Sequence, residues 1–81
     1  SYEAAGLLGE LLLEDGQAVE ATDALSRALA ADPDNIPWRR ALVTALMAAS
    51  RREDALSHCR ALLTRRPDDA VGQVRMARLL L

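Results

Sequence analysis

Apolar residues recur along the chain with the spacing of one face of an α-helix. In residues 2–14, Ala5, Leu8 and Leu12 lie about one turn apart, with Leu7 and Leu11 beside them. Spacings of three and four residues predict an amphipathic helix. Similar patterns recur four more times. We therefore predict five helices, over residues 2–14, 17–31, 36–49, 51–65 and 70–81.

Turn-forming residues separate the first three predicted helices. Gly16 suits the left-handed backbone conformation that closes a helix. Pro33 ends the second helix, because proline has no N–H to donate and disfavours helical geometry at the residue before it. Asn35 is a favourable N-cap for the third helix, and Pro37 is tolerated in its first turn.

The last two predicted helices have capping residues of their own. Ser50 followed three residues later by Glu53 matches a capping box, which predicts that a helix opens at about residue 51. Pro67 marks its end, and Asp69 can cap the fifth helix. The turns between helices are therefore short, as expected for antiparallel neighbours.

The composition supports an all-α fold and a single small domain. Ala and Leu, two strong helix formers, make up 31 of 81 residues, whereas the chain has only 4 Gly and 3 Pro. No apolar run approaches the ~20 residues of a membrane span, and no targeting segment is recognisable, so we expect a soluble protein of undetermined compartment. One Cys excludes an internal disulfide framework.

The chain repeats itself at a shift of 34 residues. This shift aligns apolar positions, small residues, helix caps and turn prolines. The aligned pairs are Leu8 with Leu42, Leu12 with Leu46, Gly16 with Ser50, Ala21 with Ala55, Pro33 with Pro67 and Asn35 with Asp69.

A helix–turn–helix unit of this length, ending in an Asp-Pro or Arg-Pro corner, resembles the tetratricopeptide repeat (TPR). The resemblance implies a right-handed α-α superhelix, a TPR-like solenoid of antiparallel helix pairs. It divides the chain into one repeat at 2–35, a second at 36–69, and the first helix of a third at 70–81. Because that last helix ends apolar, we expect a fragment of a longer protein or a chain that self-associates there.

The resemblance also implies that the first helix of each pair lines a concave groove that holds a protein or peptide partner. The groove positions expected to contact a partner are Glu10, Leu13, Arg40, Thr44, Met47, Arg75 and Arg78, with Glu3, Gly6 and Val74 also facing the groove. Some family members grip a terminal carboxylate with Lys and Asn. Those residues are absent from the matching positions here.

Charge is divided unevenly between the two halves of the chain. Residues 1–35 carry eight acids against one Arg, a balance of −7, and residues 36–81 have a balance of +5. Arg side chains can form forked contacts with carboxylates, so an acidic or carboxylate-bearing segment is a candidate partner for Arg40, Arg75 and Arg78. The alternative is that these Arg are ordinary solvated side chains. With one Trp and few aromatics, the chain is a poor nucleic-acid surface.

The sequence offers no convincing catalytic, cofactor or metal site. His58 and Cys59 are the only His and Cys, and adjacent helical residues point about 100° apart, so they cannot readily form a catalytic dyad. We expect Cys59 in the core and His58 on the surface, and we predict no enzyme activity for these residues.

Two functions therefore stay open. The first is a protein–protein interaction scaffold that binds a peptide or partner domain in the groove. The alternative is a structural or self-association module that links domains or protomers and has no specific groove ligand.

Overall fold

The computed structural model describes all 81 residues and contains five helices and no strand. They are α1 (Tyr2–Glu14), α2 (Ala18–Ala31), α3 (Ile36–Ala48), α4 (Arg52–Arg65) and α5 (Ala70–Leu80). Each begins and ends within one residue of the range predicted from the apolar spacing. The predicted all-α fold is therefore confirmed.

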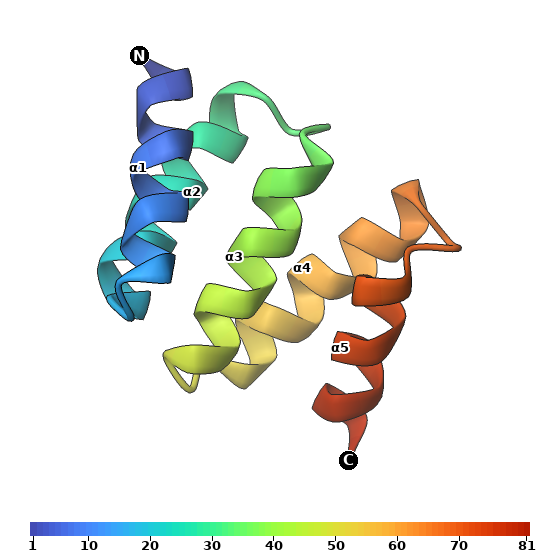
Figure 1. Cartoon of the computed structure of the whole chain (residues 1–81). Coiled ribbons are helices and arrows are strands. Elements are labelled where there is room, and N and C mark those ends of the chain that lie inside the picture. The colour runs from blue at the N-terminus through green and yellow to red at the C-terminus, as the bar shows by residue number, and fades with distance from the viewer.

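The helices form two layers. Helices α1, α3 and α5 run in the same direction and make one layer, while α2 and α4 return in the opposite direction behind them (Figure 1). Each helix packs against its neighbour in sequence, and α3 also contacts both α1 and α5. The surface presented by α1, α3 and α5 is called the front face below.

The core lies between the two layers and is built mostly from Leu and Ala. Its ten buried residues come from every helix except α1, and Leu12 and Leu13 of α1 pack against it. Gly9 sets the approach of α1 to α2, because a Cβ atom added there would lie 2.5 Å from Leu25 Cγ. A small residue is therefore required where these two helices cross.

Three of the predicted turn and cap residues take the expected roles. Gly16 has a φ of 78°, in the left-handed region. The side chain of Asn35 accepts a hydrogen bond from the Trp38 backbone N–H at 3.0 Å. The side chain of Asp69 accepts one from the Gly72 backbone N–H at 2.7 Å. These two caps fix where α3 and α5 begin.

The predicted capping box at Ser50 is wrong. Helix α4 begins at Arg52, its N-cap is Arg51, and no side chain caps it. Ser50 instead has a φ of 61° and ends the turn after α3, as Gly16 does after α1. The tight turn between the antiparallel helices needs a left-handed residue at this position, and that need overrides the capping preference of serine.

Cys59 is fully buried in the core, which confirms its expected place. His58 is half-buried rather than exposed, so the prediction of a surface side chain is wrong. Its Nδ1 lies 3.1 Å from Nη1 of Arg39, a side chain that is itself only 8% exposed. Arg39 also donates to the carbonyl oxygen of Pro33 at 2.9 Å. The long Arg39 side chain therefore covers His58 and joins α3 to α4.

Candidate functional site

The front face carries the residues predicted to contact a partner, and several of them are already engaged within the chain. At the junction of α1 and α3, Glu10 accepts a hydrogen bond from Nε1 of Trp38 at 3.0 Å. The indole ring packs over Gly6, where an added Cβ atom would lie 2.2 Å from Trp38 Cε2. Tyr2 meets the same ring edge-to-face, with centroids 6.2 Å apart. Trp38 therefore bridges α1 and α3.

Arg40 lies further along the front face and forms an ion pair with Asp69. Its Nε donates to Asp69 Oδ1 at 2.8 Å, and its Nη2 donates to the same oxygen. The Asp69 side chain is only 5% exposed. The hydrogen bond from Arg40 is the main cause that lowers the pKa of the Asp69 carboxyl, and it raises the pKa of Arg40.

The expectation that Arg40 offers a free guanidinium to a partner is therefore corrected. It binds the carboxylate that caps α5, and so it fixes α5 against α3. Two other predicted residues have intramolecular contacts. The hydroxyl of Thr44 donates to the carbonyl oxygen of Arg40 at 3.1 Å, and Leu13 is half-buried against the core.

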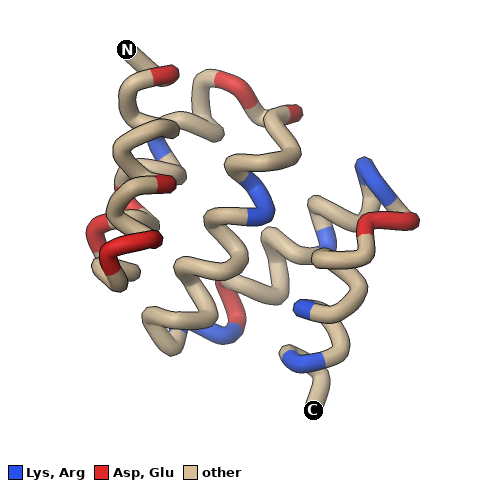
Figure 2. The backbone as a smooth tube through the Cα atoms, viewed as in Figure 1, with Lys and Arg blue, Asp and Glu red and all other residues tan.

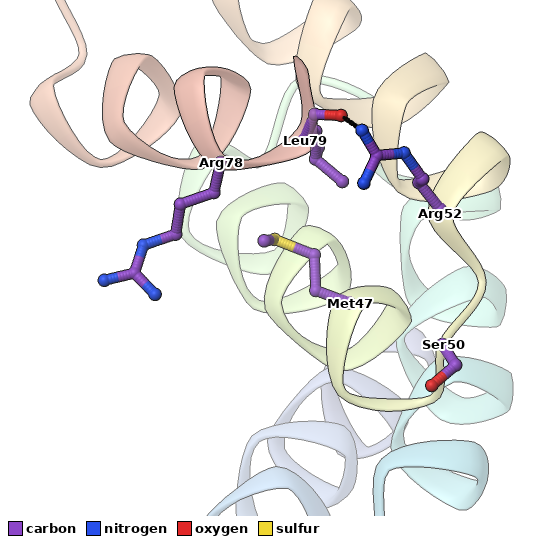
Figure 3. A pocket seen from close by; sticks show the side chains of 5 residues that line it. All are labelled: Met47, Ser50, Arg52, Arg78 and Leu79. Atoms are coloured by element: carbon purple, nitrogen blue, oxygen red, sulfur yellow. Dashed lines mark hydrogen bonds between the residues drawn. The ribbon is translucent and has the colours of Figure 1, made fainter. Parts of the chain in front are cut away.

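Met47 and Arg78, two of the predicted groove residues, both line a depression between the ends of α3 and α5. The depression has a volume of about 280 Å³ and is also lined by Ser50, Arg52 and Leu79. Met47 points toward α5, and the Arg78 guanidinium extends away from the other lining residues (Figure 3). Arg52 donates through Nη2 to the carbonyl oxygen of Leu79, near the end of α5. An apolar thioether thus lies beside an exposed cation.

Arg75 and Arg78 lie one turn apart on α5, and neither forms an ion pair within the chain. The Nε of Arg75 is buried and has no hydrogen-bond partner. Figure 2 shows acidic residues gathered over α1 and α2, whereas α5 carries only basic charges. This end of the front face is therefore positive, with donors that could bind a carboxylate.

Sequence reasoning missed three contributors to this face. Trp38 bridges α1 to α3, Asp69 binds Arg40, and Arg52 binds the last turn of α5. The 34-residue shift held a clue to the second, because it aligns Asp69 with Asn35 and Arg40 with Gly6. The second junction between front-face helices, that of α3 with α5, is therefore held by a charged pair.

The remaining chemistry of the molecule does not suggest catalysis. Burial raises the pKa of the Cys59 thiol, and its Sγ lies 3.3 Å from the carbonyl oxygen of Gly72. A thiol with a raised pKa is a poor nucleophile at neutral pH. No group of three or more His, Cys, Asp or Glu side chains is placed to hold a metal ion. None of the five helices is both long and apolar enough to cross a membrane.

Comparison with known proteins identifies the repeat. The family model described as tetratricopeptide repeat matches residues 12–79, well over half of the chain. A search of curated proteins gives no significant match. Tetratricopeptide repeats generally mediate protein–protein interaction and are typically non-enzymatic scaffolds. The two-layer array of paired helices and the match to this model agree, and the chain belongs to the tetratricopeptide repeat family.

Proposed function

We propose that the front face binds a protein or peptide partner, and that Arg75, Arg78 and Met47 contact an acidic or carboxylate-bearing segment of it. The supporting observation is the state of the two Arg side chains. Neither has a carboxylate partner within the chain, and Arg78 is exposed. A carboxylate on a partner would supply the charge-assisted hydrogen bonds that these guanidinium groups do not form within the chain.

In this proposal the repeats divide as residues 2–35, 36–69 and the first helix of a third repeat at 70–81. Helices α1 and α3 carry Glu10, Leu13 and Thr44 along the same face, where they give shape and polar edges to the surface. Arg40 acts through Asp69, because the ion pair holds α5 and therefore the two unpaired Arg side chains in position.

Met47 gives the proposed site an apolar contact beside its positive charge. Its side chain is half-buried against the core and lines the same depression as Arg78. Methionine adapts its shape to different apolar groups. A segment that combines acidic residues with Leu or Ala therefore fits this end of the front face better than a purely acidic one.

The test uses fluorescently labelled peptide pools as probes. One pool holds random ten-residue peptides of Asp, Glu, Ala and Leu, and the other replaces the acids with Lys and Arg. We expect the acidic pool to bind at low salt and to weaken as salt is added, because exposed charges are screened. Arg78→Gln should weaken binding about tenfold, the equivalent of ~1.4 kcal/mol.

Arg60→Gln is the matched control, because Arg60 is an exposed cation on α4 in the other layer. It removes the same charge and should leave the affinity for the acidic pool nearly unchanged. Failure of the acidic pool to bind, equal binding of the basic pool, or equal losses in the two variants would contradict the proposal.

A further inference from the structure

We propose that the partner segment is bipolar: besides the acidic residues that lie over α5, it carries a basic residue, Lys or Arg, that lies over α1. This inference rests on the proposed function, because it concerns the other end of the same front face. Two features support it. One is a row of residues whose charge changes from α1 to α5, and the other is an aromatic pair at the acidic end of that row.

The row follows from the internal repeat. The 34-residue shift aligns Glu10 with Thr44 and Thr44 with Arg78, so these residues take the same position on α1, α3 and α5. The three helices lie side by side in the front layer, with α3 in contact with both of the others (Figure 1). The row is therefore negative on α1, uncharged on α3 and positive on α5.

Both charged ends of the row are open to a partner. Neither Glu10 nor Arg78 forms an ion pair within the chain, and both side chains are exposed. Arg40 lies one turn before Thr44 on α3, but Asp69 already balances its charge. The two ends of the row therefore determine the charges that a bound segment must carry, and their opposite signs fix its direction across the helices.

The acidic end of the row also presents aromatic side chains. Glu10 accepts the hydrogen bond from Trp38 Nε1, and the exposed Tyr2 ring meets the indole edge-to-face. An ionised carboxylate can accept several hydrogen bonds, so Glu10 still has room for a second donor. The Glu3 carboxylate is the main cause that raises the pKa of the Tyr2 phenol, and Asp32 acts in the same direction. Carboxylates and aromatic rings both attract cations, so a Lys or Arg side chain fits this end.

The separation of the two ends sets the spacing of charges in the segment. Packed helices lie about 8–10 Å apart, so Glu10 and Arg78, which are two helices apart, are separated by about 16–20 Å. An extended chain rises ~3.3 Å per residue, so the basic residue should lie about five or six residues from the acidic ones. This spacing distinguishes the bipolar segment from one in which the charges are mixed.

The test compares four labelled ten-residue peptides that have blocked ends and two adjacent Glu among Ala, Leu and Gln. Two carry a Lys about six residues from the Glu pair, one before it and one after it. The third has the same composition with the Lys beside the Glu pair, and the fourth has no Lys. Fluorescence anisotropy at low salt measures each dissociation constant. We expect one spaced peptide to bind about fivefold more tightly than the peptide without Lys, and the third peptide to show no such gain.

Two variants of the protein locate the gain. Glu10→Gln should remove it, although the glutamine oxygen can still accept the hydrogen bond from Trp38. Glu20→Gln is the matched control, because Glu20 is an exposed acid on α2 in the other layer, and it should retain the gain. Trp38 is the only Trp of the chain, so its fluorescence gives a second measurement. Its emission should change more with the spaced peptide than with the peptide without Lys.

The outcomes separate this inference from the proposed function. A spaced peptide that binds no better than the peptide without Lys, an equal gain for the third peptide, or a gain that survives Glu10→Gln would overturn the inference alone. If no peptide binds, or if Arg78→Gln leaves every affinity unchanged, both the inference and the proposed function are wrong.

Discussion

The indole of Trp38 fills the space over Gly6, so closely that a Cβ atom at Gly6 would lie 2.2 Å from Trp38 Cε2. The second junction of the front face, between α3 and α5, is built differently. The 34-residue shift places Arg40 where Gly6 stands and Gly72 where Trp38 stands. There the large side chain comes from the earlier helix, and Arg40 reaches the Asp69 carboxylate that caps Gly72. Trp38 and Arg40 thus each join α3 to one of its two neighbours in the front layer.

Gly6→Ala should destabilise the fold. Overpacking against the Trp38 ring costs about 1–3 kcal/mol. Replacing glycine by alanine inside a helix gains only ~1 kcal/mol in helix propensity, so the net effect is a loss of stability. In a Trp38→Ala background the overlap is gone, so the same substitution should become stabilising by about 1 kcal/mol. Urea unfolding followed by circular dichroism measures the free energy of unfolding of wild type, the two single variants and the double variant. The same effect of Gly6→Ala in both backgrounds would refute the contact.

Arg40→Gln should lower the free energy of unfolding by about 1–3 kcal/mol, because it leaves the almost fully buried Asp69 carboxylate without its charged partner. Adding Asp69→Asn should recover part of this loss, since Asn35 already serves as the cap at the equivalent position. Arg51→Gln is the control: it breaks an exposed ion pair with Asp54 and should cost less than ~1 kcal/mol. Equal losses for Arg40→Gln and Arg51→Gln would contradict the structural role given to Arg40.

Ser50→Gly should stabilise the protein by about 1 kcal/mol, because the left-handed conformation of Ser50 is unfavourable for a residue with a Cβ atom. Ser57→Gly, at an exposed position inside α4, should instead destabilise by about 0.5–1 kcal/mol. Thermal unfolding shows whether each variant is more or less stable than wild type. A loss of stability in Ser50→Gly would show that the serine caps α4 after all.

His58 should make the protein less stable in mild acid. Burial, and then the nearby Arg39 guanidinium, lowers the pKa of the imidazole below its ordinary value of 6.5. Because Arg39 can only donate, Nδ1 of His58 accepts and the ring is neutral in the folded protein. The unfolded chain therefore takes up the proton more readily, and stability falls as the pH drops below about 6.5.

The measurement is the free energy of unfolding between about pH 7.5 and 5.5 in wild type and in His58→Gln. We expect the downward slope in wild type and a flatter profile in the variant. Asp69, whose pKa is lowered, loses its contribution only below its ordinary value of 3.8, so it does not obscure this window. A wild-type slope that persists unchanged in the variant would contradict the assignment to His58.

The sequence predicted the helices and two caps because these depend on neighbours within one or two turns. Asn35 and Asp69 act on backbone N–H groups only three residues away. The contacts that organise the front face could not be predicted so directly. Arg40 meets Asp69 across 29 residues, and the Trp38 bond to Glu10 spans 28, so both depend on how the helices cross. The capping box predicted at Ser50 is wrong because the serine side chain favours an N-cap, whereas the turn requires a left-handed residue at that position.

The two methionines offer a direct way to test whether the Met47–Arg78 end of the front face binds an acidic segment. Both are half-buried, but Met47 lines the depression beside Arg78, whereas Met76 packs against the core and is not among its lining residues. We would label both methyl groups with carbon-13 and record their NMR signals while adding the acidic peptide pool. We expect the Met47 signal to shift progressively, the Met76 signal to stay in place, and Arg78→Gln to reduce the Met47 shift. An unmoved Met47 signal, or equal shifts of both methyl groups, would contradict it.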